Sequence, residues 1–183
     1  PKDMYDIGTV GLVIRMLKMP DQRVRVLVQG VARAQVKTWD EGSLYFQAHI
    51  SVLEETQPEA SNLQIEALIR NVNAALERAA SLGKNISQEV MVIASNLDDP
   101  GRLADLAASN LSLKVEDAQS ILSILDPAKR LRRVHELLTR EVELLAMQQQ
   151  ITSRAKDEID KGQREYFLRQ QLKAIQSELG EGN

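Results

Sequence analysis

The stretch GLVIRMLKMPDQRVRVLVQG, residues Gly11–Gly30, decides the first part of the fold. Apolar residues recur at every second position on both sides of a central Pro20-Asp21 pair. A period of two residues is typical of a β-strand, and a proline–aspartate pair is typical of a tight turn. The stretch therefore predicts a β-hairpin, with Gly30 at a bulge or bend in the second strand.

Strict alternation assigns the side chains of this hairpin, and of a third strand, to faces. The apolar sets are Leu12, Ile14 and Met16 in the first strand, Val24, Val26 and Val28 in the second, and Leu44, Phe46, Ala48, Ile50 and Val52 in the third. The third strand, at residues 44–55, follows a predicted turn at residues 39–43. Three strands are close to the smallest stable sheet, and the rest of the chain offers no obvious cover for them. We therefore expect residues 1–56 to be a partial antiparallel β subdomain whose first strands lie before Pro1.

Beyond residue 56 the apolar residues recur with the period of a helix. Pro58 and Glu59 suit the first turn of a first helix, and Gly83 suits its C-terminal end. Ser87 is a candidate N-cap for a short second helix, because its hydroxyl can accept from the backbone of the first turn.

Two further helices complete this region. Asp99 followed by Pro100 predicts the start of one, because aspartate is favoured at the N-cap and proline at the first helical position. KVEDAQSILSIL, residues 114–125, predicts the other. The loops between the helices are short, so residues 57–125 are expected to form a compact helical bundle.

Asp126-Pro127 repeats the aspartate–proline start, and no proline follows it. The helical sequence that remains would span on the order of 80 Å. An apolar seam in its first half thins in a polar middle and resumes near the end of the chain. Residues 126–183 are therefore predicted to form a long, coiled-coil-like helix that packs on the bundle and then projects into solvent or pairs weakly with another helix. The predicted fold class is α+β.

The composition excludes several classes of protein. A formal net charge of −3 argues against a protein held to nucleic acid or membranes mainly by its overall field. The chain has no cysteine, which excludes disulfides and thiolate metal sites and suits a reducing compartment. No run of residues approaches the roughly 18 apolar residues of a membrane span. The first residues are polar and lack a methionine, so we expect the chain to begin inside a longer protein.

Motifs of catalysis and cofactor binding are missing from the sequence. It contains no GxxxxGK phosphate loop, no GxGxxG and no GxSxG. His49 and His135 are isolated and are expected to be structural or surface residues. We predict no catalytic residue, no metal site and no cofactor site in these residues. The chain is therefore expected to bind another molecule, to hold other parts of a protein apart, or to help a complex to assemble.

Three charged groups have structural interpretations. Glu54-Glu55 is typical of a strand end, and Asp98-Asp99 of a helix cap. Lys129–Arg133, KRLRR, could contact phosphate or an acidic partner. We favour the other interpretation of this cluster, a solvated helix face beside acidic neighbours.

The stretch REYFLRQQLKAIQSELGE, residues 164–181, strongly resembles the end of the N-terminal region of the ATP-dependent protease Lon. In that family a Tyr-Phe-Leu-Arg-Glu-Gln-Leu-Lys-Ala-Ile block ends a long helix and leads into the ATPase module. Residues 166–175 match this block except at Gln170, where the family has glutamate. Residues 8–36 and 126–145 also resemble the family's hairpin and the start of its long helix, so the resemblance extends across the chain.

The resemblance implies a non-catalytic region that recognises substrates and helps to assemble the hexamer of an ATP-dependent serine protease, which degrades misfolded and regulatory proteins. ATP and Mg, and the Ser-Lys dyad of the peptidase, would belong to the parent protein and not to these residues. The implied partners are unfolded or degron-bearing proteins and other Lon subunits, with no membrane partner. The implied location is the bacterial cytoplasm, with the mitochondrial matrix as the alternative.

Exposed apolar residues of the hairpin are the first candidate site. Leu17, Met19, Pro20 and Leu27 are candidate substrate contacts, because misfolded chains differ from folded ones mainly in exposed apolar surface. The alternative is that these four side chains pack on other strands or on the bundle.

The end of the long helix is the second candidate site. Its assembly and docking residues are Tyr166, Phe167, Leu168, Leu172, Ile175 and Leu179. We expect this ridge to stay unburied within the chain and to dock on a surface that the chain does not contain. The alternatives are a purely structural spacer or oligomerisation arm and, less favoured, a nucleic-acid-binding module that would depend on Lys129–Arg133 as its only basic feature.

Overall fold

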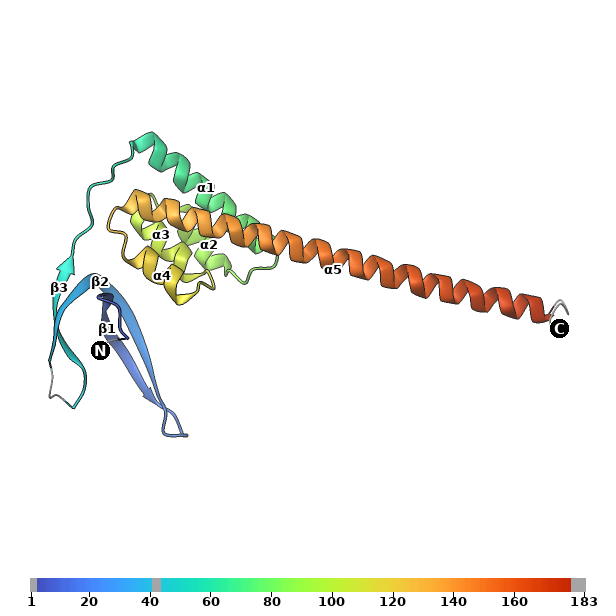
Figure 1. The fold of residues 1–183 in the computed structure, drawn as a ribbon, viewed down its shortest axis with the longest axis horizontal. Helices are drawn as coiled ribbons and strands as arrows, with labels where there is room; N and C mark the ends of the chain where they lie inside the picture. The colour runs from blue at the N-terminus through green and yellow to red at the C-terminus, as the bar shows by residue number, and fades with distance from the viewer. Residues whose placement is uncertain (1–2, 41–43, 179–183) are drawn as a thin grey trace.

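The structure, a computed structural model, describes residues 3–40 and 44–178. Its elements are β1 (Ile7–Lys18), β2 (Val24–Asp40), β3 (Gln47–Leu53), α1 (Asn62–Ser81), α2 (Gln88–Ser95), α3 (Pro100–Ser109), α4 (Val115–Leu122) and α5 (Pro127–Glu178). Figure 1 shows the strands at one end, α1–α4 grouped around the start of α5, and the rest of α5 projecting away from them. The predicted α+β class is confirmed.

The predicted hairpin is formed by β1 and β2, which pair antiparallel. The Met19 N–H donates to the Arg23 carbonyl oxygen at 2.8 Å, and the Gln22 N–H donates to the Met19 carbonyl oxygen at 3.1 Å. Gln22 has a positive φ of 66°. These features define a three-residue loop, in which a type I turn at Pro20-Asp21 is followed by a left-handed residue.

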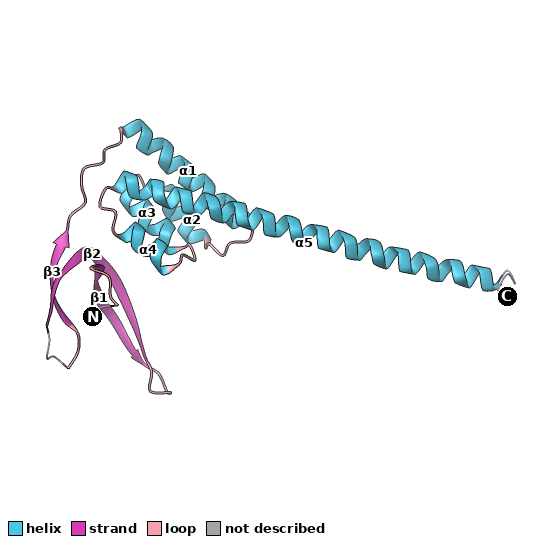
Figure 2. Cartoon of the chain, viewed as in Figure 1, coloured by secondary structure: helices cyan, strands magenta, loops and turns pink. Residues whose placement is uncertain are grey.

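The long strand β2 pairs with β1 along its first part and with β3 along its second part, as Figure 2 shows. Val10 pairs with Ala32 and Gly11 pairs with Gly30, which leaves Val31 as an extra residue in β2. The bulge predicted at Gly30 is confirmed. An extra residue bends its strand, and β2 curves between its two partners.

The third strand is shorter than its sequence pattern predicts. β3 begins at Gln47, which pairs with Asp40 at the end of β2, so no described β2 residue remains to pair with residues 44–46. Trp39 and Asp40 of the predicted turn belong to β2, and its residues 41–43 lie outside the described residues. The rings of Trp39 and Phe46 meet edge to face beside this turn, with centroids 6.3 Å apart.

The core of the molecule lies among the helices, where α1 and α3 pack on the first part of α5. Its side chains are aliphatic, as the low aromatic content requires. The members without exposed surface are Val72, Leu76, Ala79, Leu103, Ala104, Ala107, Leu131, Val134 and Leu138. Within the described residues of the sheet, Ala34 alone is a buried apolar residue.

Most predicted helix ends are confirmed, with one correction. The side chains of Ser87 and Asp99 accept from the backbone of the first turns of α2 and α3. Gly83 follows the end of α1 with a positive φ of 97°, a conformation that favours glycine. The prediction that Pro58 and Glu59 start the first helix is wrong. Ser61 is the N-cap, because its side chain and that of Gln64 form a reciprocal capping box.

The long helix α5 begins at the predicted aspartate–proline pair. Asp126 accepts from the N–H groups of Ala128 at 2.8 Å and Lys129 at 3.0 Å. The helix continues through Gly162 to Glu178 as one element. From residue 147 to residue 178 every side chain is exposed, so this part of α5 extends beyond the bundle.

Candidate functional site, an apolar hairpin and a projecting helix

The register of the hairpin divides its outer part into two faces, because residues directly opposite each other in an antiparallel pair point to the same side. One face, here called the valine face, carries the pairs Val13·Val28, Met16·Val26 and Lys18·Val24. The other, here called the basic face, carries the pairs Leu12·Gln29, Arg15·Leu27 and Leu17·Arg25.

The valine face differs from the face that strict alternation predicts. A register shift lies between Val13 and Arg15 and makes Ile14 an extra residue of β1. Val13 therefore joins Met16 and the three valines of β2, while Leu12 lies on the opposite face. The expectation that Leu12, Ile14 and Met16 share one face is wrong, because the bulge shifts the alternation by one residue.

The large apolar residues of the valine face are exposed although they lie in a regular strand pair. Met16 is 60% exposed, Val26 is 41% exposed and Val28 is 54% exposed. Isolated exposed aliphatic residues are common, but a contiguous exposed apolar patch is typical of an interaction site. The sequence signal for this face was present in the alternating valines, but the four residues selected as substrate contacts did not include them.

Those four predicted contacts are exposed and lie elsewhere on the hairpin. Leu17 and Leu27 are diagonal neighbours on the basic face, and Met19 and Pro20 form part of the turn. Each of the four is exposed, so none of them packs on the bundle. The structure brings Leu17 and Leu27 together, and it adds Arg15 and Arg25 beside them.

The predicted docking residues of α5 do not form one ridge. Successive residues of an α-helix are rotated by about 100°. Leu168, Leu172 and Ile175 therefore lie within about 60° of one another, whereas Tyr166 lies nearly opposite Leu168. Tyr166 instead continues a stripe with Ile151 and Ile159.

The part of α5 that extends beyond the bundle, here called the arm, thus carries two apolar stripes. The middle stripe consists of Ile151, Ile159 and Tyr166, and the end stripe consists of Leu168, Leu172 and Ile175. Both are exposed, as expected for residues that dock on another surface. Phe167 is about 100° from Tyr166 and from Leu168 and belongs to neither stripe. Leu179 lies outside the described residues.

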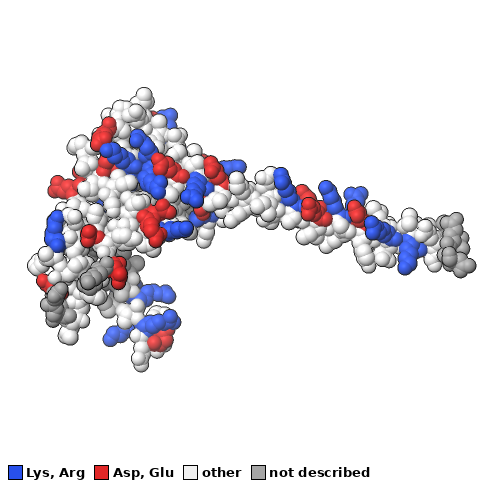
Figure 3. All heavy atoms as spheres, in the orientation of Figure 1, with Lys and Arg blue, Asp and Glu red and all other residues white. Residues whose placement is uncertain are grey.

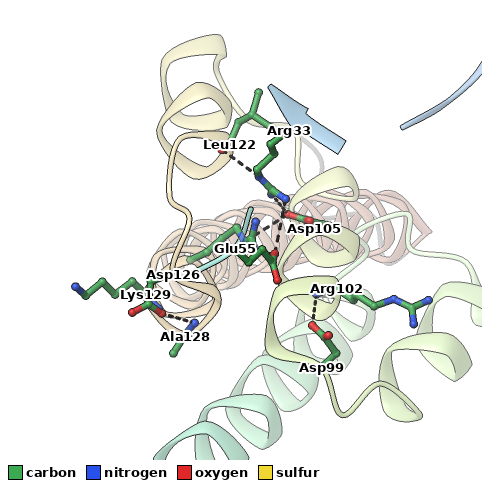
Figure 4. A network of polar contacts seen from close by, with 10 residues as sticks. Arg33, Glu55, Asp99, Arg102, Asp105, Leu122, Asp126, Ala128 and Lys129 are labelled. Carbon is green, nitrogen blue, oxygen red and sulfur yellow. Dashed lines mark hydrogen bonds and ion pairs between the residues drawn. The ribbon is translucent and has the colours of Figure 1, made fainter. Parts of the chain in front are cut away.

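A charged cluster joins the sheet to the helices, as Figure 4 shows. Arg33 on β2 pairs with Asp105 on α3, with 2.5 Å between Nη2 and Oδ1, and its Nε donates to the Leu122 carbonyl oxygen at 3.1 Å. Arg130 on α5 has no exposed surface, and its Nη2 donates to Glu55, two residues beyond β3. The Arg130 Nε lies 3.7 Å from Asp105 Oδ1, which connects the two pairs.

The interpretation of Lys129–Arg133 as a solvated helix face beside acidic neighbours fits the exposed Lys129 and Arg132 but not Arg130. Arg130 is buried, Lys129 pairs with Glu59 at 2.7 Å, and Arg133 lies 3.2 Å from Asp117. Arg130 is therefore held within the fold, whereas Lys129 and Arg133 pair with acidic neighbours nearer the surface. Sequence reasoning missed the cluster because its partners are 72 and 75 residues apart.

Gly101 at the start of α3 is part of the same arrangement. A Cβ at this position would lie 2.8 Å from Nη2 of Arg130 and 2.8 Å from Oε1 of Glu55. Any larger residue would push the buried guanidinium away from its carboxylate. Glycine is therefore required here by the close approach of the charged pair and not by the backbone angle.

Asp126 forms a second polar link between the linker and α5. Its Oδ2 accepts from the Glu59 N–H at 3.2 Å, in addition to the two N–H groups of the helix start. Burial raises the pKa of Asp126, but the N–H groups of Lys129, Glu59 and Ala128, with the Lys129 charge, outweigh burial and lower this pKa below its ordinary value of 3.8. The carboxylate is therefore stabilised in its charged form.

A groove of about 570 Å³ lies between β2 and the helices α3 and α4. Apolar side chains such as Val31, Leu111 and Ile121 line it. Its charged groups, Arg33 and Asp105, are already paired with each other. The groove therefore offers apolar walls without a free charge.

The described residues contain one glycine–lysine pair, Gly83-Lys84, and no grouped metal ligands. Lys84 follows a glycine, but its Nζ donates to Glu141 at 2.6 Å and to Ser112 at 3.3 Å, and it closes the end of α1 onto α5. Within residues 3–40 and 44–178, no group of three or more His, Cys, Asp or Glu side chains could hold a metal ion. The same residues include no helix with the length and apolarity needed to cross a bilayer.

Comparison with known protein families shows to which family this chain belongs. The family model described as the ATP-dependent protease La (LON) substrate-binding domain matches residues 1–140. The chain belongs to the Lon family. The resemblance to Lon is therefore confirmed by a match that does not include residues 164–181, where the resemblance was strongest.

Curated Lon proteases align with the whole chain. The chain is 52% identical over 182 residues to the Lon protease of Geobacter metallireducens, covering 99% of this chain and 22% of that protein. It is 43% identical over 183 residues to Lon protease 2 of Bdellovibrio bacteriovorus, covering 100% of this chain and 23% of that protein. The chain thus spans less than a quarter of the length of these relatives.

A solved structure shares the fold. The N-terminal domain of the Mycobacterium avium complex Lon protease superimposes with a TM-score of 0.60 at 22% sequence identity. The match covers 75% of this chain and 72% of that chain. The two chains therefore share a fold over about three quarters of this chain.

Proposed function

We propose that this chain recognises protein substrates for an ATP-dependent serine protease by holding exposed apolar segments on its β1–β2 hairpin. The observation that carries the proposal is the valine face, a set of large apolar side chains that remain exposed on a regular strand pair. Misfolded proteins expose apolar segments that folded proteins bury, so a surface of this kind distinguishes the two.

The strength expected of such a contact suits a recognition step. Burying an aliphatic side chain contributes about 1.5–3 kcal/mol, and association itself costs several kcal/mol of lost freedom. Contact with a few residues of the valine face would therefore bind an unfolded segment weakly and reversibly. Weak binding allows a substrate to be released toward the module that unfolds it.

The arm formed by α5 supports a second part of the proposal. Its 52 residues extend about 78 Å at 1.5 Å per residue, and two exposed apolar stripes lie along its outer part. We infer that the stripes contact other Lon subunits or the ATPase module and so contribute to a homohexamer. The ATP, Mg and Ser-Lys chemistry would belong to the remainder of the longer protein, in the bacterial cytoplasm.

Binding to an unfolded model protein tests the hairpin proposal. Val26→Ser together with Val28→Ser removes the centre of the valine face, and about a tenfold loss of affinity for a reduced, carboxymethylated model protein is expected. Val92→Ser is the matched control, because Val92 is 60% exposed on α2 and far from the hairpin in sequence. Equal affinities for the double variant and the unchanged chain would contradict the proposal.

A purely structural arm is the second candidate function, and the exposed end stripe favours it. Leu168→Ser, Leu172→Ser and Ile175→Ser together would weaken assembly of the parent protein and leave substrate affinity unchanged. Sedimentation of the parent and the triple variant distinguishes the two roles. An unchanged hexamer would remove the assembly role from this stripe.

A further inference from the structure

The two faces of the hairpin differ in charge. On the basic face Arg15 opposes Leu27 and Leu17 opposes Arg25, so that arginine and leucine side chains alternate both along and across the strands. All four side chains are exposed. The valine face carries one charge at its end, from Lys18.

The hairpin is strongly basic within an acidic chain. Residues 11–29 contain four cationic side chains and one carboxylate, a local formal charge of +3, whereas the formal net charge of the chain is −3. Figure 3 shows Lys and Arg side chains gathered at the free end of the hairpin, with little Asp or Glu among them. The concentrated positive charge of this chain is therefore not confined to Lys129–Arg133.

The positive charges of the basic face are not neutralised within the described residues. Arg15 and Arg25 form no ion pair with any residue of 3–40 or 44–178. The hairpin carboxylate, Asp21, is held by Arg23, with 2.6 Å between Nε and Oδ2. The hydrogen bonds from the Arg23 side chain and backbone lower the pKa of Asp21, so this carboxylate stays charged and paired with Arg23 at the turn.

We propose that the basic face binds extended protein segments in which acidic residues alternate with large apolar residues. The inference rests on the proposed substrate-binding function and names its substrate class. The two arginines would pair with carboxylates, and the leucines between them would contact apolar side chains. The stretch Leu12–Leu17 is about 17 Å long, which matches an extended segment of five or six residues.

Nucleic acid fits this face less well than an acidic peptide. Residues 11–29 contain no aromatic side chain on which a base could stack. A phosphate backbone would also bury the leucines that separate the arginines against a charged chain. An alternating acidic and apolar peptide matches both kinds of side chain.

Fluorescence anisotropy with the full 183-residue chain tests the inference. The probes are labelled peptides of equal apolar content whose remaining residues are acidic, neutral or basic, together with single-stranded DNA and anionic phospholipid vesicles. At about 50 mM salt the acidic peptide is expected to bind about tenfold more tightly than the neutral one, and this preference disappears near 500 mM salt because screening shortens the range of the charges.

Variants assign the preference to the two arginines. Arg15→Gln with Arg25→Gln should lower affinity for the acidic peptide about five- to tenfold and leave the neutral peptide unaffected, while Arg15→Lys with Arg25→Lys should retain most of the preference. Arg102→Gln with Arg132→Gln is the control, because it removes the same charge from exposed sites on α3 and α5. Circular dichroism checks that each variant is folded.

The outcomes separate this inference from the proposed function. Equal binding of acidic and neutral peptides, or an Arg15→Gln, Arg25→Gln variant that keeps the preference, overturns the basic-face inference and leaves substrate binding intact. Tighter binding of DNA or vesicles than of the acidic peptide also overturns it. If no apolar peptide binds at all, both the inference and the proposed function fail.

Discussion

The helical bundle and the β1–β2 hairpin are both rich in aliphatic side chains, but they use them in opposite ways. In the bundle Leu76 and Leu131 have no exposed surface, because helices pack around them. In the hairpin Val26 and Val28 are 41% and 54% exposed on a strand pair with neither face buried. Similar residues therefore form a core where the fold supplies neighbours and stay exposed to solvent where it does not.

The largest expected change in the free energy of unfolding comes from a substitution in the bundle core, and a matching substitution in the hairpin gives the comparison. Leu131→Ala should lower the free energy of unfolding by about 3 kcal/mol, because it leaves a cavity in a closed core. Val26→Ala should lower it by about 0.5 kcal/mol, because much of the side chain is already in water. Urea denaturation followed by circular dichroism measures both. Similar losses for the two variants would mean that the hairpin is packed and that the comparison is wrong.

The next effect tests the charged joint between the two regions. Arg130→Ala should cost about 2–3 kcal/mol, since it leaves Glu55 without its buried partner, although the exposed part of that carboxylate regains water. Lys129→Ala is the control and should cost less than about 0.5 kcal/mol, because its pair with Glu59 is exposed. A thermal melt gives both values. If the two variants melt alike, the cluster does not stabilise the joint.

The pH dependence of stability tests the second polar link, Asp126. The folded-state pKa of Asp126 is lowered, so its contribution is fully present above the unfolded value of 3.8 and is lost as the pH falls through the folded pKa. Asp126→Asn should cost about 1 kcal/mol at neutral pH and should reduce the loss of stability between about pH 5 and pH 2. Unfolding free energies across this range test the sign. A variant with an unchanged acid profile would show that other carboxyl groups dominate.

The smallest expected effect is local to the hairpin turn. Gln22→Gly should stabilise the hairpin by about 0.5 kcal/mol, because glycine adopts the positive φ at this position without steric cost. Amide hydrogen exchange should slow about twofold in β1 and β2 and stay unchanged in α1 and α3. Slower exchange in the bundle as well would show that the two regions open together.

Features that depend on a few neighbouring residues were predictable. The hairpin, the bulge at Gly30, the caps at Ser87 and Asp99 and the start of α5 follow from turn chemistry, capping and periodicity within short windows. The start of α1 was misplaced because a proline in a linker suits a first turn as well as a true helix start does. The two stripes of α5 also follow from residue spacing once the helix is known to be continuous.

The exposure of apolar residues on the hairpin was predicted, but their grouping into two faces was not. The hairpin was selected correctly as a region of exposed apolar residues, and its four candidate contacts still await a binding experiment. Their neighbours on each face could not be predicted, because the extra residue at Ile14 changes the register and is visible only when the two strands are paired.

By itself, the sequence determined that this chain has an antiparallel hairpin, a capped set of helices and one long helix, since these depend on interactions between residues close together in the chain. Only the tertiary structure decided which apolar residues are buried, which face of the hairpin carries the arginines, and that Arg130 and Arg33 join the sheet to the helices. These outcomes depend on contacts between residues as many as 89 positions apart, and such contacts leave no periodic or local signal.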